Sequence, residues 1–254
     1  MSDLYEHTTD GPARGRIRLL QLYPGDMNIY GDWGNALVLA RRAQWQGYDV
    51  EMLSYDRGEE LKGDVHLIVG GGGQDSGQER IKEDLLARGP ALRDLAEAGT
   101  PMLVICGLYQ LFGHHFVTSG GVEMPGIGVL DAHTVAGNQR LIGNIAVESE
   151  DFGTVVGYEN HSGLTRLGPG TRPLGRVRPG EGNNGQDGTE GARSHHVIGT
   201  YLHGSLLPKN PAVADWLLAR AVERSGGQWE PVPVDDPVEA WAERAREVAL
   251  SRPR

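Results

Sequence analysis

The sequence predicts an α/β fold, with an open, mostly parallel sheet, helices on both faces and an antiparallel extension. Residues 65–69 and 102–106 are short runs that are apolar throughout or nearly so, as expected for parallel strands that are buried on both faces. Each run leads directly into glycine and then into a segment with helical character, so strands and helices alternate along the chain. This alternation predicts right-handed strand–helix–strand units.

The first half of the chain supplies most of this sheet. Residues 17–22 read as the first strand, which Pro24 and Gly25 end. Asp32 or Asn35 then caps a helix that runs to about Gln46. The elements expected after it are strands at 50–54, 65–69 and 102–106, one or two helical segments up to about Ala98, and a helix at 108–112.

Beyond Gly120 the pattern changes to short β-rich pieces separated by glycine turns. They lie at 129–130, 142–147 and 154–158 and predict the antiparallel extension. Residues 178–194 contain almost nothing to bury, so we expect a mobile surface loop there. The last elements expected are a strand and two amphipathic helices, at 197–203, 211–225 and 236–250.

The length of 254 residues suits one large domain with appendages, because cores of ~100–250 residues routinely form a single domain. We expect a flexible N-terminal arm at 1–16, the α/β domain at 17–210 and a helical C-terminal extension at 211–254.

Charge and composition exclude several classes of partner. A net charge of −10 and a pI near 5.4 argue against nucleic acid and anionic membranes, since both need a basic face. The N-terminal residues are acidic where a signal peptide is basic, and no stretch approaches the ~18 apolar residues of a membrane span. We therefore expect a cytoplasmic protein. The single cysteine, Cys106, excludes an internal disulfide and a cysteine-rich metal site, and we expect no metal.

Cys106 is the first candidate for chemistry. A lone intracellular cysteine at the end of an apolar strand is often only a small buried hydrophobe. Here, however, the strand, the cysteine, Gly107 and a helix follow in the order of a nucleophile elbow, which projects the side chain at the carboxyl edge of the sheet. The helix N-terminus favours the thiolate, which is the species that attacks a carbonyl.

His203 is the candidate acid/base. A thiolate that attacks an amide needs a proton donor for the leaving ammonia, and His203 ends a late strand, where sites on open sheets collect. The alternative is a structural histidine at a strand edge. The pairs at 114–115 and 195–196 are weaker candidates, because adjacent side chains point apart.

Glycine-rich backbone can supply the donors for an oxyanion. The run 70–73 follows a buried strand and lets bare N–H groups approach a substrate, so Gly72 is expected to give one donor and Gly107 the other. The same run could be a flexible turn or a phosphate cradle, but it lacks both the P-loop pattern and a proper G-x-G-x-x-G.

These pieces together resemble a known family. Residues 104–110, Val-Ile-Cys-Gly-Leu-Tyr-Gln, resemble the nucleophile motif of class I glutamine amidotransferases of the cobyric-acid-synthase-like branch. The runs at 70–73, 157–163 and 199–204 fit the same branch in order. Residues 28–35 and 138–143 resemble more specifically the glutaminase subunits of bacterial lipid II isoglutaminyl synthases, which amidate the D-glutamate of the peptidoglycan stem peptide. The resemblance spans about 17–210 and implies a flavodoxin-like fold.

The resemblance also implies roles for further residues. Arg140 matches the position that holds the substrate glutamine, and an arginine fork suits an α-carboxylate. Gln110 matches another substrate-contacting position. Many class I members carry a glutamate two residues after the histidine, where this chain has Ser205, so the third catalytic group is open. The resemblance implies that the partner subunit contributes an aspartate to the site; Glu159 and Asp32 are the internal alternatives.

A partner is expected, because amidating a carboxylate needs ATP and this chain has no P-loop. The resemblance implies a heterodimer with a Mur-ligase-like synthetase subunit, which would hold ATP and Mg, whereas this chain would need only L-glutamine and no cofactor. Trp216, Trp229 and Trp241 on the C-terminal helices are candidates for the docking surface, or else pack on the chain's own sheet.

Three other functions stay open at this point. The ammonia acceptor could be a cobyrinic acid instead, although such enzymes usually carry the ATP-using domain on the same chain. The chain could be a catalytically silent regulatory module of the same fold. It could also be a cysteine hydrolase that acts alone on small amides, which robust glutaminase activity without a partner would favour.

Overall fold

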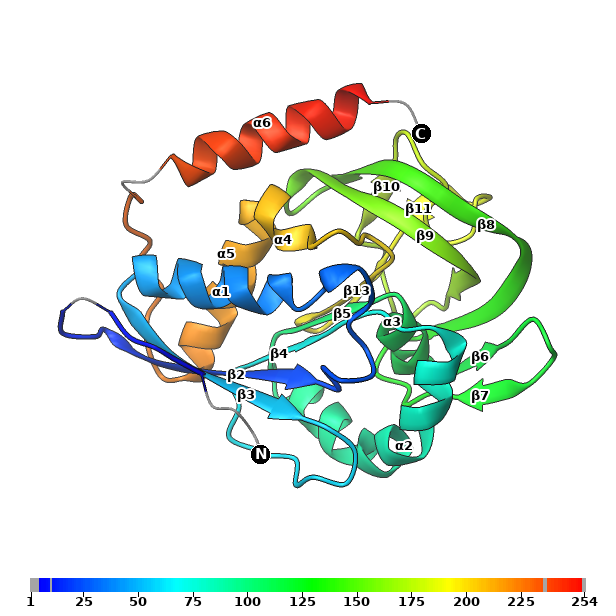
Figure 1. Ribbon diagram of the computed structural model, residues 1–254, viewed down its shortest axis with the longest axis horizontal. Helices are drawn as coiled ribbons and strands as arrows, with labels where there is room; N and C mark the ends of the chain where they lie inside the picture. Colours follow the sequence, from blue (N-terminus) through cyan, green and yellow to red (C-terminus); the bar gives the residue numbers. More distant parts are fainter. Residues whose placement is uncertain (1–4, 10, 235–236, 253–254) are drawn as a thin grey trace.

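The computed structural model describes residues 5–9, 11–234 and 237–252 (Figure 1). Its centre is a seven-stranded sheet in the order β1-β3-β2-β4-β5-β13-β12. The five inner strands are parallel and follow the flavodoxin-like order, while β1 and β12 pair antiparallel at the edges. The strands are β1 (Tyr5–His7), β2 (Gly15–Leu22), β3 (Tyr48–Tyr55), β4 (Leu67–Gly70), β5 (Met102–Ile105), β12 (Ala192–Ser194) and β13 (Val197–Thr200). The predicted parallel sheet is confirmed.

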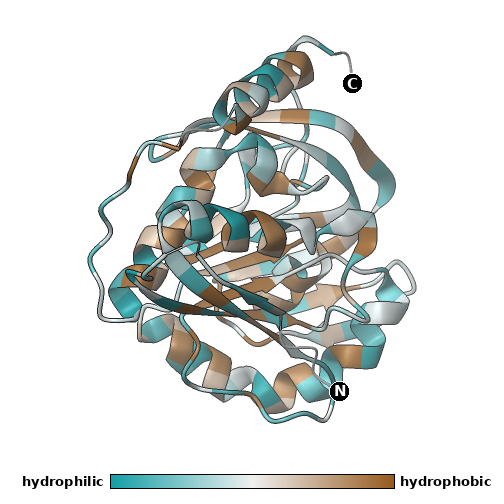
Figure 2. Cartoon of the chain, turned by 60° about the vertical axis from the view of Figure 1, so that its left-hand side comes forward, coloured by the Kyte–Doolittle hydropathy of each residue, from teal (hydrophilic) through white to brown (hydrophobic). Residues whose placement is uncertain are grey.

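Helices cover both faces of this sheet. In Figure 1, α1 (Gly34–Trp45) and α5 (Pro211–Arg224) lie on one side, and α2 (Asp75–Glu97) lies on the other with α3 (Gly107–Phe112). The inner strands are the most apolar part of the chain in Figure 2, as the buried runs predict. The segment expected as one or two helices up to Ala98 is the single helix α2, which continues through Pro90.

The antiparallel region forms a second sheet of its own. Its order is β11-β10-β8-β6-β7, with β9 paired to β8. Among the described residues, isolated bridges link Tyr158 of β9 to His203, beyond the end of β13, and Arg172 to Arg193 of β12. The strands are β6 (His115–Val117), β7 (Glu123–Pro125), β8 (Ala132–Ser149), β9 (Gly153–Leu167), β10 (Gly175–Val177) and β11 (Thr189–Glu190).

The short strands predicted here are therefore parts of two long ones. Residues 142–147 and 154–158 lie within β8 and β9, whereas 129–130 form no strand. Gly137 and Gly157 lie inside these strands, where the absence of a side chain permits close packing, whereas Gly153 begins β9 directly after a turn. A Cβ on Gly157, for example, would lie 2.6 Å from the Cβ of Leu202.

The prediction of a mobile loop at 178–194 is wrong. Glu159, buried in β9, accepts the N–H groups of Glu181 and Gly182 at 2.9 and 2.8 Å. Asn183 is also fully buried and bonds Tyr109 and both backbone groups of Gly191. The low apolar content of the segment suggested a mobile loop. Its buried groups are polar, however, and hydrogen bonds rather than apolar contacts hold it in place.

The ends of the chain also differ from a simple arm and tail. Residues 5–7 of the predicted flexible arm form β1, and residues 1–4 and 10 lie outside the described residues. At the other end, α6 (Val238–Ser251) follows α5 as predicted and lies over α4 (Leu206–Lys209), β8 and β9. The buried guanidinium of Arg42 binds Asp215 on α5 and Glu239 on α6, at 2.8 and 2.7 Å, and thereby ties α6 to the domain.

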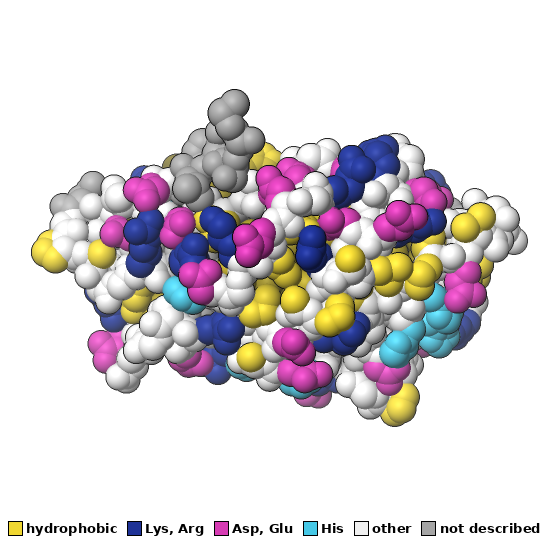
Figure 3. All heavy atoms as spheres, turned by 90° about the horizontal axis from the view of Figure 1, so that it is seen from below, with side chains coloured by type: hydrophobic (Ala, Val, Ile, Leu, Met, Phe, Trp, Pro, Cys, Tyr) yellow, Lys and Arg dark blue, Asp and Glu magenta, His cyan; other side chains and the backbone are white. Residues whose placement is uncertain are grey.

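The three tryptophans divide between core and surface. Trp216 and Trp229 pack against the core, which favours the intramolecular alternative for them, whereas Trp241 on α6 is 64% exposed. On the face seen in Figure 3, acidic and basic side chains are interspersed among apolar atoms. No helix in the described part of the chain is long and apolar enough to cross a membrane.

Candidate active site

The turn between β5 and α3 has the geometry of a nucleophile elbow. Cys106 has φ 48° and ψ −101°, a strained conformation for a residue other than glycine, and its N–H donates to the carbonyl of Thr200 on β13 at 2.8 Å. The strand expected to reach Cys106 thus ends at Ile105, one residue earlier. Gly107 is needed for the close approach to the glycine run, because a Cβ there would lie 3.0 Å from the nitrogen of Gly73.

His203 lies beside Cys106, as the sequence predicts. The expected strand stops at Thr200, but the backbone of His203 exchanges hydrogen bonds with Tyr158 of β9, which fixes its position. Gly72 marks the meeting point of the two side chains. A Cβ on Gly72 would lie 2.8 Å from Cε1 of His203 and 3.1 Å from Cβ of Cys106.

The imidazole of His203 is fully buried between Tyr30 and Asp32. Its ring meets the Tyr30 ring edge-on at 4.9 Å, and Nδ1 lies 3.4 Å from Oδ2 of Asp32. Burial lowers the pKa of His203, but the charge of Cys106 and the contact with Asp32 outweigh it and raise this pKa to about 10. The arrangement therefore favours an imidazolium beside the cysteine.

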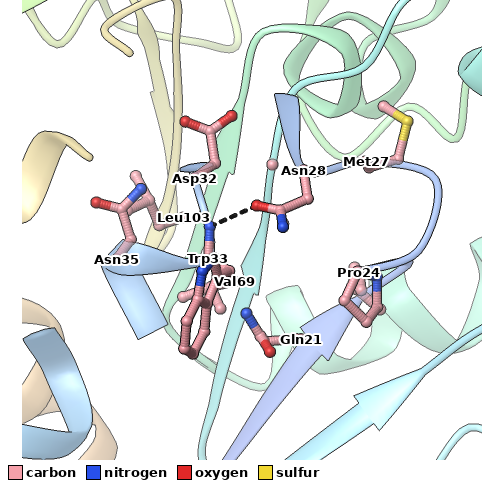
Figure 4. A pocket seen from close by; sticks show the side chains of 12 residues that line it. Gln21, Pro24, Met27, Asn28, Asp32, Trp33, Asn35, Val69 and Leu103 are labelled. Carbon is pink, nitrogen blue, oxygen red and sulfur yellow. Dashed lines mark hydrogen bonds between the residues drawn. The ribbon is translucent and has the colours of Figure 1, made fainter. Parts of the chain in front are cut away.

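The glycine run departs from the expected oxyanion site. The N–H of Gly72 donates to Oδ2 of Asp32 at 2.7 Å, so in this structure it is not free to bind an oxyanion. The N–H groups of Gly73 and Gly107 have no hydrogen-bond partner among the described residues. Asp32 belongs to the turn before α1, shown in Figure 4, where the side chain of Asn28 accepts the N–H of Trp33.

A pocket of about 440 Å³ opens onto the thiol. Cys106, 8% exposed, and Gln110 line its buried end, whereas Arg140 and Asp75 are exposed side chains of the same pocket. The amide of Gln110 is held in place, because it accepts from Gln78 at 2.7 Å and donates to the hydroxyl of Tyr201 at 3.2 Å.

Arg140 reaches this pocket through an irregularity in β8. The register with β9 shifts between Ala136 and Leu141, and such bulges re-aim side chains beside sites. The guanidinium donates to Oδ1 of Asn160 at 2.8 and 3.1 Å, and Asn160 in turn donates to the hydroxyl of Tyr30 at 2.7 Å. Arg140 is thus linked to the aromatic ring that covers His203.

Glu159, one of the two internal candidates for the third catalytic group, and Ser205, which replaces the usual glutamate, are both engaged elsewhere. The hydroxyl of Ser205 donates to the carbonyl of Gly31 at 3.0 Å, and the carboxylate of Glu159 holds the 178–194 segment. Asp32 is the carboxylate that contacts His203.

The sequence interpretation missed four residues of the site: Tyr30, Gln78, His161 and Tyr201. Burial lowers the pKa of His161 to about 3, so its ring is neutral; Nδ1–H donates to the carbonyl of Gly163 and the ring stacks on Tyr201 at 3.6 Å. Nε2 is therefore an acceptor, and it is buried without a partner in the described part of the chain. The motif at 157–163 was the available signal for His161.

Comparison with known proteins agrees with this geometry. The model of the CobB/CobQ-like glutamine amidotransferase domain matches residues 18–211. The chain belongs to this family. As a CobB/CobQ-like glutamine amidotransferase it hydrolyses glutamine.

Relatives within the glutamine amidotransferases are similar over most of their length. The lipid II isoglutaminyl synthase (glutamine-hydrolyzing) subunit GatD of Staphylococcus aureus is 39% identical over 227 residues, which cover 89% of this chain and 91% of that protein. The same subunit of Streptococcus pneumoniae is 36% identical over 224 residues, 86% and 85% of the two chains. A crystal structure of a glutamine amidotransferase, 20% identical, superposes with a TM-score of 0.56 over 82% of this chain and 98% of its own, which supports the fold.

Proposed function

We propose that this chain is the glutaminase subunit of a lipid II isoglutaminyl synthase and supplies ammonia to a partner that amidates the D-glutamate of the peptidoglycan stem peptide. The main support is the 39% identity to a lipid II isoglutaminyl synthase subunit over 89% of this chain and 91% of that protein. The cysteine–histidine pair beside a pocket is consistent with it. Similarity of this extent covers the whole domain rather than one motif.

The chemistry follows from the paired side chains. The thiolate of Cys106 attacks the side-chain carbonyl carbon of glutamine, and a C–S bond forms as electrons move onto the oxygen. The oxyanion collapses, the C–N bond breaks, and Nε2–H of His203 gives its proton to the leaving ammonia. Water then attacks the thioester, His203 takes one of its protons, and the C–S bond breaks to release glutamate and restore the thiolate.

The oxyanion needs donors near Cys106. Gly107 N–H, next to the nucleophile, is one candidate, since it has no partner among the described residues. Gly72 N–H would be available only after it leaves Asp32, whereas Gly73 N–H is free of that contact.

The substrate would lie along the pocket with its amide at the buried end. Gln110 lines that end and would contact the carboxamide, while Arg140 at the exposed end would bind the α-carboxylate as a fork. Asp75, the exposed acid of the same pocket, has the charge to attract the α-ammonium.

A heterodimer with an ATP-dependent, Mur-ligase-like subunit completes the proposal. Ammonia released alone would be lost, and activation of a carboxylate needs ATP and Mg, which the partner would bind. The assembly would work in the cytoplasm, where ATP is available.

The test is ammonia release from glutamine by the chain and by its Cys106→Ala and Cys106→Ser variants, each with and without the Mur-ligase-like subunit. We expect activity that rises with the partner and falls at least ~1000-fold in both variants. Activity that does not depend on Cys106 would overturn the mechanism. Full activity without a partner would favour a hydrolase that acts alone. A lack of activity even with the partner would favour a catalytically silent module.

A further inference from the structure

Asp32 is buried against the imidazole of His203. Its side chain is 1% exposed, and its two oxygens lie 3.4 and 3.5 Å from Nδ1 of His203. One oxygen also accepts the N–H of Gly72 at 2.7 Å, which fixes the orientation of the carboxylate. A buried carboxylate needs such partners, because an unpaired one would be strongly destabilising.

The segment that carries Asp32 is held on both sides. Asn28 accepts the N–H of Trp33 at 2.9 Å, Ile29 N–H donates to Gly72, and Ser205 donates to the carbonyl of Gly31 at 3.0 Å. The carboxylate is therefore placed before any substrate binds, as a positioning residue must be.

Other ionisable groups around His203 do not compete for Nδ1. Cys106 faces it from the end of β5, and the ring of Tyr30, from the turn before α1, makes an edge-to-face contact with it. From β9, His161 is held neutral by burial, which lowers its pKa to about 3, and from β8 the charge of Arg140 also acts on His161.

We propose that Asp32 positions His203 for catalysis: it keeps the proton of the neutral imidazole on Nδ1, leaves Nε2 to exchange a proton with Cys106, and stabilises the imidazolium. This inference rests on the proposed glutaminase function. It assigns Asp32 of this chain, rather than an aspartate of the partner subunit, to the role that a glutamate has in many class I members, where this chain has Ser205. Nε2 has no other partner among the described residues, as this assignment requires. A carboxylate in this place sets both tautomer and orientation of a catalytic histidine.

The decisive variant is Asp32→Asn. Its Oδ1 can still accept the Gly72 N–H, so the turn keeps its anchor, but its NH₂ group would face Nδ1 and push the proton onto Nε2. The matched control is Asp26→Asn, which removes the same charge from the same segment; Asp26 pairs with Arg57 and Arg80.

Two readouts separate positioning from a structural role. The first is the split between kcat and KM for glutamine, measured with the Mur-ligase-like partner present. The second is the pH profile of alkylation by iodoacetamide for the chain alone, which reports Cys106 because the chain has one cysteine. Alkylation needs the thiolate but no glutamine turnover.

In Asp32→Asn we expect kcat to fall at least ~100-fold, with KM changed by less than about threefold. The alkylation profile should move to higher pH by about one unit or more, because the imidazolium beside the thiolate loses its anion. Asp26→Asn should match the wild type in both readouts.

An alkylation profile equal to that of Asp26→Asn would overturn the proposal even if kcat falls. A shifted profile supports it even if no ammonia is released, and that result would count against the proposed function instead. If Asp32→Asn does not fold, ¹⁵N-histidine NMR of Cys106→Ala decides: a neutral His203 protonated on Nδ1 supports the proposal, and one protonated on Nε2 overturns it. The signal is assigned by its loss in Cys106→Ala/His203→Gln.

Discussion

Glu190 is expected to lower the stability of this protein as the pH rises towards neutrality. Its carboxyl group is fully buried; one oxygen accepts from the hydroxyl of Thr200 at 2.5 Å and from the N–H of Tyr201 at 2.8 Å. The other oxygen has no partner among the described residues. Burial is the main cause that raises the pKa of Glu190 from 4.5 to about 7.

The sign follows from proton binding. Between pH 4.5 and about 7 the folded state keeps a proton on Glu190 that the unfolded state has released, so the free energy of unfolding falls as pH rises through this window. A pKa difference of this size corresponds to roughly 3 kcal/mol. Replacement by glutamine removes the titration but keeps an acceptor for Thr200 and Tyr201.

We therefore expect Glu190→Gln to gain stability relative to the wild type as pH rises, by roughly 3 kcal/mol between about pH 4.5 and about pH 8. Urea unfolding across this range measures the difference directly, and the midpoint of thermal unfolding should follow it by roughly 6–12 °C. Glu97→Gln, at an exposed position at the end of α2, is the control. Equal pH slopes for Glu190→Gln and the wild type would refute the reasoning.

Three further outcomes are expected. Arg42→Ala should lower the free energy of unfolding by roughly 1–3 kcal/mol and speed hydrogen exchange in α6, since Asp215 and Glu239 lose their shared guanidinium; unchanged exchange in α6 would contradict this. Gly72→Ala should lower kcat at least ~100-fold, because its methyl group would clash with His203 and Cys106. A near-normal kcat would show that these side chains can move aside without loss of activity. Trp241→Ala should change the free energy of unfolding of the isolated chain by less than about 0.5 kcal/mol, because the ring is exposed; a larger loss would contradict this exposure.

Local patterns were sufficient for the parallel sheet and for the strand–turn–helix geometry at Cys106. A run such as 102–106 is apolar at every position because both faces of the strand are covered, and this shows in sequence without knowledge of the neighbours. The elbow is equally local, since Cys106 and Gly107 follow one another. Features that depend on contacts between residues distant in sequence were not predicted. Examples are the full length of strands β8 and β9 and the burial of the 178–194 segment.

The sequence by itself determined the α/β class, the elbow at Cys106 and the choice of His203, because each is written in consecutive residues or in a recognisable motif. Tertiary structure decided that Asp32 rather than Ser205 or Glu159 meets His203, and that Gly72 gives its N–H to that carboxylate. The physical reason is that hydrogen bonds between residues 40 or 171 positions apart leave no periodic trace along the chain. Only the folded arrangement selects which of several acids and amides become partners.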